Sequence, residues 1–264
     1  MTVPALSVPE TPRLETSEPK QILRFLLSER HLHWAVAVPF MICYTTALIL
    51  VTVYNPNPTR PFRLVVSWTH RISGIFLALL PLLAIIRHRH DLRIHLHNIR
   101  EAWVWRLDDV KWLVLMGPAT LNKKIDLPDQ GKFNAAEKIN FMVLTGTYPL
   151  YLFTGLMIWF STVPFMAWIV HFSLALVATP LMLGHIFMAT VNPDTRIGLS
   201  GMFSGMVDRH WAKHHYRRWY DEHFGKRASR TEGVVEVAPR PRVVPVLPFH
   251  HRAGVRSVPL RDRT

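Results

Sequence analysis

The chain has 264 residues, of which 49% are hydrophobic, and its 31 lysines and arginines against 18 acidic residues give a formal charge of +13. Its one cysteine, Cys43, lies within an apolar run, so an internal disulfide framework, a self-contained iron–sulfur site and a C-x-x-C-H haem attachment are excluded. The positive charge would suit nucleic acid, but the basic residues flank long apolar runs. We therefore expect them to lie beside anionic lipid and expect no nucleic-acid partner.

The N-terminal segment, residues 1–30, contains no long apolar core and therefore predicts no cleaved signal peptide. Residues 1–19 hold four prolines and scattered acids, a composition typical of disorder. The stretch from Lys20 to Arg30 has apolar residues at helical spacing with charges opposite them. This pattern predicts a short interfacial helix that leads into a membrane.

Four apolar runs follow, each close to the roughly 20 residues that an α-helix needs to cross the hydrocarbon core of a bilayer. They cover about residues 34–54, 65–86, 139–162 and 165–190. Tryptophans near the ends of these runs suit the aromatic belt of a membrane protein. The sequence therefore predicts four membrane spans.

Loop charges predict how the spans are oriented. Both terminal segments and the long loop over residues 87–138 carry nearly all of the lysines and arginines, so the positive-inside rule places them in the cytoplasm. The predicted fold is all-α, an up-down-up-down four-helix bundle over residues 31–220. Residues 92–116 mix large apolar and basic residues, which predicts an amphipathic surface helix. Residues 221–264 form a basic tail whose composition predicts disorder.

Histidines are the candidate functional residues. Most of the fifteen lie in basic segments and need no role beyond solvation, but His70, His171 and His185 lie inside spans and His33 lies at the mouth of the first. Ionisable side chains within a bilayer are costly and are usually functional. One such histidine could equally donate a hydrogen bond to a neighbouring carbonyl; four at matching depths favour ligands.

Depth sorts these four histidines into two pairs. His70 and His171 each lie early in a span that begins at the outer face. His185 follows His171 by fourteen residues, which is about 21 Å deeper at about 1.5 Å per residue and level with His33. Fourteen helical residues also return to within about 40° of the same direction, so both histidines of the fourth span point to one side. Each pair of imidazoles could hold one haem iron.

Two nearby residues leave alternatives open. The string HLHW offers His31 as well as His33 for the inner ligand, and we prefer His33 because His31 is farther from the span and follows Arg30. Arg71, beside His70, could pair with a haem propionate. A role in which Arg71 extends toward the membrane surface is equally open.

Several strings resemble the di-haem cytochrome b (gamma) subunit of quinone-linked membrane formate dehydrogenases and, more loosely, the b-type cytochrome subunits of nickel–iron hydrogenases. The resemblance covers roughly residues 30–220 and implies two haem b groups, one held by His70 with His171 and one by His33 with His185. The matching strings are HW at His33, His70 followed by Gly74, GKFNAAEK at 131–138, His171 and His185 followed by IFMA, and GMVDRHWAKHHYRRWY at 205–220.

The resemblance also implies a quinone site beside the inner haem, near Asn134, Ala136 and Glu137. The family usually has Asn-Ala-Gly-Gln at this place, whereas this chain has Asn-Ala-Ala-Glu, which leaves the detailed quinone contacts open. A carboxylate at Glu137 could accept a proton during quinol chemistry. It could equally be a cap or a surface charge at the start of the third span.

By this resemblance, the chain is an electron-transfer subunit of an oxidoreductase complex, multi-pass in a bacterial or archaeal cytoplasmic membrane. Its expected partners are an iron–sulfur subunit, a catalytic subunit with molybdenum, tungsten or nickel–iron, membrane lipid, and menaquinone or ubiquinone. The direction of electron flow stays open. The alternatives are a cytochrome that serves a hydrogenase, a thiosulfate reductase or another molybdo-enzyme, a haem-free membrane anchor, and a transporter with a histidine proton relay. No acidic residue lies deep in a span, which disfavours the transporter.

Overall fold

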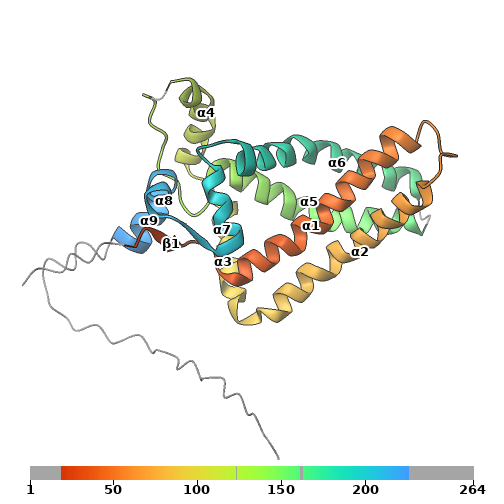
Figure 1. The fold of residues 1–264 in the computed structure, drawn as a ribbon, viewed down its shortest axis with the longest axis horizontal. Helices are drawn as coiled ribbons and strands as arrows, with labels where there is room; N and C mark the ends of the chain where they lie inside the picture. Colours follow the sequence, from red (N-terminus) through yellow and green to blue (C-terminus); the bar gives the residue numbers. More distant parts are fainter. Residues whose placement is uncertain (1–18, 123, 161–162, 226–264) are drawn as a thin grey trace, which may run out of the picture. The chain divides into compact units, whose positions relative to one another are not determined.

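The computed structural model of the chain describes residues 19–122, 124–160 and 163–225. Four of the described helices are long and apolar enough to cross a membrane (Figure 1). The fold is therefore the predicted all-α membrane bundle. The four helices are α1 (Leu27–Ile49), α2 (Arg63–Arg87), α5 (Ala135–Trp159) and α6 (Pro164–Ile186), with α1 and α6 continued by π-helical turns over Leu50–Tyr54 and Phe187–Val191.

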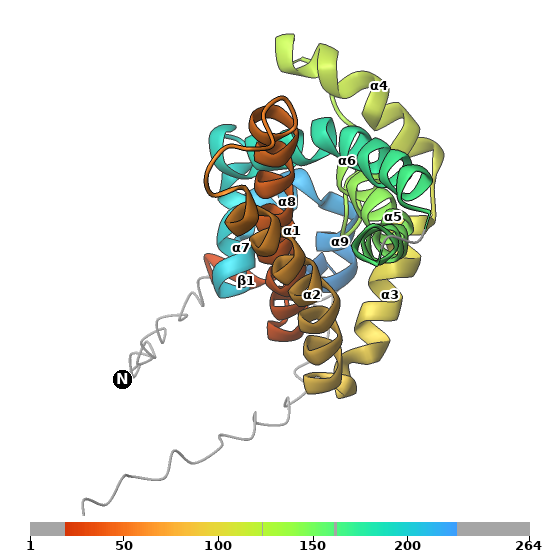
Figure 2. The same cartoon turned by 90° about the vertical axis from the view of Figure 1, so that its right-hand side faces the viewer.

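The bundle is built from two helix pairs. Helix α1 packs along α2, and α5 packs along α6 (Figure 2). Hydroxyl groups join the pairs, since Tyr148 of α5 donates to the carbonyl oxygen of Leu77 in α2 and Tyr44 of α1 donates to Thr179 of α6 at 2.8 Å. Many large apolar side chains on these helices are exposed, as lipid-facing surfaces require.

Residues 20–30 do not form the predicted interfacial helix. Strand β1 (Gln21–Leu23) pairs antiparallel with β2 (Met206–Asp208), and α1 begins only at Leu27. Ile22 and Val207 are nearly inaccessible to solvent and belong to a buried cluster that we call the aromatic cluster. Its members are Ile22, Val207, Trp211, Ala212, Tyr216, Trp219 and Tyr220. The helix prediction was wrong because helical spacing is a local signal, while the partner strand lies at the far end of the described chain.

The predicted surface helix over residues 92–116 is two helices, α3 (Leu92–Trp103) and α4 (Leu107–Leu121). The Asp109 carboxylate caps the start of α4, where it accepts a hydrogen bond of 2.8 Å from the backbone N–H of Arg106. The same carboxylate oxygen lies 2.8 Å from the ammonium group of Lys138 at the start of α5. Lys138 also donates to the Val104 carbonyl at 2.9 Å. A buried ion pair therefore fixes the break between α3 and α4.

Short elements gather at the end of the bundle where α1 begins (Figure 1). They are 3₁₀ turns over Arg89–Asp91 and Arg196–Gly198, α7 (Leu199–Ser204), α8 (Arg209–His215), α9 (Arg217–Tyr220) and a π-helical turn over Asp221–Gly225. Phe224 of that last turn packs against the aromatic cluster, although the tail prediction begins at residue 221. Residues 1–18, and the predicted tail from 226 onward, lie outside the described residues.

Candidate functional site

The four intramembrane histidines meet in two pairs. The outer pair is His70 of α2 with His171 of α6, whose ring centroids lie 6.3 Å apart. The inner pair is His33 of α1 with His185 of α6, also 6.3 Å between centroids. Two imidazoles that bind one metal ion through nitrogens at about 2.0 Å place their centroids about 6 Å apart. Both pairs therefore have a spacing that suits a shared ion.

Hydrogen bonds fix the ring of His70. Its Nδ1 lies 2.9 Å from the Cys43 carbonyl oxygen and 3.1 Å from the Thr46 hydroxyl. The Thr46 hydroxyl donates its proton to the Ile42 carbonyl at 2.6 Å, so it can only accept from the ring. The proton of His70 is therefore on Nδ1, and the Nε2 lone pair is left for a metal ion.

His171 repeats this arrangement on the other helix pair. Its Nδ1 lies 2.9 Å from the Thr154 hydroxyl, which donates to the Leu150 carbonyl at 2.6 Å. Histidines that bind metals almost always donate their other ring N–H to such a partner. Sequence reasoning missed Thr46 and Thr154, whose only signal is a hydroxyl within an apolar run.

The structure separates His31 from His33. The ring of His33 faces His185, whereas Nδ1 of His31 lies 2.9 Å from Nε2 of His88. Two helical residues turn the chain by about 200°, so the two rings leave α1 on opposite sides. Within the described residues, neither ring of the inner pair has a hydrogen bond. Only His33 of these two is therefore placed to act with His185.

Space beside the histidines suits a flat ring system. A Cβ atom added to Gly74, one turn after His70, or to Gly184, beside His185, would meet no atom within 4 Å. The buried hydroxyl of Tyr151 has no hydrogen-bond partner among the described residues, although its ring packs edge-on against His171 at 5.6 Å. A buried polar atom of this kind calls for a partner that a bound group could supply.

Arg71 lies among aromatic rings. Its guanidinium carbon is 5.4 Å from the ring centroid of Trp68 and 5.4 Å from that of Trp159. Cation–π contacts with two tryptophans near the end of a span suit an anchor at the membrane surface. The pairing of Arg71 with a haem propionate stays a prediction.

The segment predicted to contact quinone forms the cap of α5. Asn134 and Glu137 exchange side chain-to-backbone hydrogen bonds of 2.9 Å across the half-buried Ala136. The other carboxylate oxygen of Glu137 accepts from the Tyr216 hydroxyl at 2.7 Å and lies 3.8 Å from the Arg24 guanidinium. Burial raises the pKa of Tyr216, so this hydroxyl stays protonated and keeps donating. Glu137 therefore acts as a cap here, and its contact with quinone stays a prediction.

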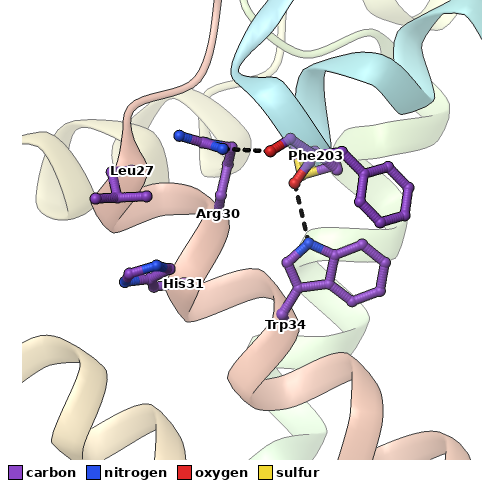
Figure 3. A pocket seen from close by; sticks show the side chains of 6 residues that line it. Leu27, Arg30, His31, Trp34 and Phe203 are labelled. Atoms are coloured by element: carbon purple, nitrogen blue, oxygen red, sulfur yellow. Dashed lines mark hydrogen bonds between the residues drawn. The ribbon is translucent and has the colours of Figure 1, made fainter.

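A pocket of about 370 Å³ lies beside the start of α1 (Figure 3). Arg30 donates to the Phe203 carbonyl, and the indole N–H of Trp34 donates to the Met202 carbonyl at 3.0 Å, which ties α7 to α1. The Trp34 ring packs edge-on against the ring of His33, with centroids 5.2 Å apart, so one wall of the pocket contacts a ring of the inner pair. Its lining consists of Leu27, Arg30, His31, Trp34, Met202 and Phe203.

Comparisons with known proteins identify the family of the chain. The family profile of prokaryotic cytochrome b561 matches residues 24–205. The chain is 27% identical over 219 residues to the cytochrome b556(Fdn) subunit of nitrate-inducible formate dehydrogenase of Escherichia coli K12, covering 78% of this chain and 93% of that protein. It is 25% identical over 225 residues to the cytochrome b556 subunit of formate dehydrogenase of Haemophilus influenzae, covering 80% and 87%.

Membership of a b-type cytochrome family implies haem b as the cofactor, and the histidine pairs are residues that can hold it. The four apolar helices give the chain a multi-pass arrangement. The chain therefore belongs to the prokaryotic cytochrome b561 family and is a formate dehydrogenase-type b-cytochrome of the bacterial cytoplasmic membrane.

Proposed function

We propose that the chain carries two haem b groups and passes electrons between a partner oxidoreductase and membrane quinone. The observation that carries this proposal is the meeting of four intramembrane histidines as two pairs, each with a ring separation of 6.3 Å. Haem b bound between the rings of each pair would supply one-electron transfer. Protein side chains alone cannot provide this reaction.

The protein residues hold and orient this cofactor. His70 and His171 would bind the outer iron, while Thr46 and Thr154 hold their Nδ1–H groups away from it. His33 and His185 would bind the inner iron. The apolar helices around both pairs exclude water and so help to set the potential of a bound haem.

The partners follow from the relatives and from the charge distribution. The similar proteins are cytochrome subunits of formate dehydrogenases, so we infer a catalytic subunit with molybdenum or tungsten and an iron–sulfur subunit. The basic loops place both termini in the cytoplasm. The iron–sulfur subunit then meets the outer pair, and menaquinone or ubiquinone meets the inner pair.

We place the approach of quinone at the pocket beside α1 rather than at the cap of α5. The carboxylate of Glu137 is already engaged by Tyr216, Arg24 and the backbone of Asn134. The pocket instead offers apolar walls, one of which, Trp34, packs against the ring of His33. Ligand sites typically combine an apolar lining with a few polar groups. Arg30 supplies one here, because its Nε–H has no hydrogen-bond partner among the described residues.

Anaerobic addition of a short-chain quinol to the purified holoprotein in detergent tests this function. We expect quinol to reduce the bound haem, with the α-band in the visible spectrum as readout. Filling the pocket with Met202→Trp is expected to slow this reduction at least about tenfold, because a larger side chain excludes the headgroup. The haem content of the variant should equal that of the unchanged protein.

Met182→Trp, on the half-buried part of α6 away from the pocket lining, is the matched control and is expected to keep the original rate. Failure of quinol to reduce haem in the unchanged protein would exclude the quinone reaction. Equal rates in both tryptophan variants would show that quinone reaches the haem by another route. This result would contradict the assignment of the quinone site to the pocket.

Removal of one hydroxyl tests how the outer pair is oriented. Thr154→Val is expected to raise the midpoint potential of the outer haem, because Nδ1–H donation makes His171 a stronger electron donor that favours ferric iron. Potentiometric titration followed in the visible range measures the shift. Thr145→Val on the same helix is the control, since its hydroxyl bonds only to Phe141 and Met142 carbonyls. The same potential in both variants would show that Thr154 does not tune the haem.

A further inference from the structure

We propose that His88, His90 and Asp91, supported by His31, form a binding site for a divalent transition-metal ion of the zinc class. The site lies where α2 ends and the chain turns toward α3. It uses none of the haem ligands, and it does not depend on electron transfer or on the quinone reaction.

The turn brings three possible ligand atoms together. One nitrogen each of His88 and His90 and a carboxylate oxygen of Asp91 all lie within 4.8 Å of one another. Helix α2 stops at Arg87, and the 3₁₀ turn Arg89–Asp91 folds the chain back so that these side chains share one space. The arrangement comes from consecutive residues in a tight turn, so little reorganisation is needed to close it around an ion.

His31 of α1 supports this set from a second element. Its Nδ1 lies 2.9 Å from Nε2 of His88, and the two rings pack with centroids 5.0 Å apart. This bond occupies Nε2 of His88 and leaves Nδ1 for the ion, so the His31 ring takes the place of the carboxylate or carbonyl that a metal-binding histidine usually contacts. His88 is only 7% exposed, so its ring is held in place.

The ligand types select the class of ion. Two imidazoles with one carboxylate suit zinc and its neighbours, with a fourth position left to water, whereas magnesium and calcium prefer all-oxygen sites. His90 is exposed and gives the ion access from solvent. The neighbouring side chains of Arg87 and Arg89 are also exposed, so water screens their positive charge.

A bound ion would have a structural consequence near the inner pair. His31 also lines the pocket beside α1, and it lies two residues before His33. The ion would therefore link the start of α1 to the turn after α2 through His31 and His88. Zinc could in this way stiffen one wall of the pocket from the membrane surface.

Titration of the full-length holoprotein with zinc chloride tests the site. The protein carries a purification tag without histidine and is stripped with chelator first; isothermal titration calorimetry then measures binding. We expect a saturable site with one ion per chain and at least about tenfold weaker binding in His90→Ala and in Asp91→Asn, because each removes one ligand. Cobalt(II) in the same site should show visible ligand-field bands that both variants lose.

His97→Ala is the matched control, since it removes an exposed histidine of α3 outside the cluster. It should bind zinc as the unchanged protein does. An unaltered haem spectrum in every variant shows that the chain is folded. Equal zinc affinity in His90→Ala, Asp91→Asn and the unchanged protein would overturn the site, and so would the absence of saturable binding.

Discussion

Replacing His171 with alanine is expected to lower the haem b content of the purified chain from two groups to one. The lost group is the outer one, because His171 supplies one of the two rings that meet at 6.3 Å. His70 would then be the one remaining axial ligand of the outer site, and the chain has no C-x-x-C-H motif that could hold the haem covalently. Haem extracted into pyridine and divided by protein concentration measures the change.

The inner pair gives a sharper version of the same experiment. His33→Ala is expected to lose the inner haem, whereas His31→Ala should keep both groups, because His31 faces His88 rather than His185. The two substitutions are the same in chemistry and only two residues apart. Loss of haem in His31→Ala with retention in His33→Ala would reverse the assignment of the inner ligand.

Controls separate ligation from folding. His97→Ala removes an exposed histidine of α3 and should retain two haem groups. Each variant should also elute from size-exclusion chromatography at the position of the unchanged protein. Two haem groups in well-folded His171→Ala protein would contradict the outer ligand pair.

Replacing Lys138 with methionine is expected to lower the free energy of unfolding by about 3–5 kcal/mol, the usual cost of leaving one partner of a buried ion pair uncompensated. The side chains of Lys138 and Asp109 are 4% and 0% exposed, and their charged atoms lie 2.8 Å apart. Methionine keeps the length of the lysine stem but removes the charge that Asp109 faces. It also removes the hydrogen bond that joins Lys138 to the Val104 carbonyl.

Chemical denaturation in detergent, followed by tryptophan fluorescence, measures this loss. Arg217→Met is the matched control, because Arg217 and Asp221 form an ion pair at 3.0 Å with side chains that are 52% and 49% exposed. Water screens such a pair, so its removal should lower the free energy of unfolding far less than Lys138→Met does. Equal losses in the two methionine variants would show that the buried pair contributes no more than a surface pair.

Local patterns in the sequence predicted the membrane helices well. Apolar runs of about 20 residues are set by bilayer thickness, and all four runs appear as helices. Three of them begin and end within four residues of the expected positions, whereas the first begins at Leu27, seven residues before the expected start. Glycine and proline within these runs do not prevent the helices from forming, because a helix that faces lipid must satisfy its own backbone hydrogen bonds. Regular spacing also predicted that His171 and His185 would lie on one side of α6.

Prediction was weakest where the partner of a residue lies far away in the chain. The spacing over residues 20–30 suits a helix, yet Ile22 is buried by pairing with Val207. The break between α3 and α4 depends on Lys138 of α5, which the rest of α4 and a loop separate from Asp109. Neither contact produces a periodic pattern in the sequence of its own segment, so no local pattern could predict it.

The sequence by itself determined the number of spans and the absence of a C-x-x-C-H haem attachment, because these depend on local composition and on residue spacing alone. Only the tertiary structure decided that His33 rather than His31 meets His185, that Thr46 and Thr154 orient the outer rings, and that Glu137 is held by Tyr216. Each of these depends on how helices rotate and pack against one another. Side chains from distant segments fix that rotation through contacts that form only in the folded chain.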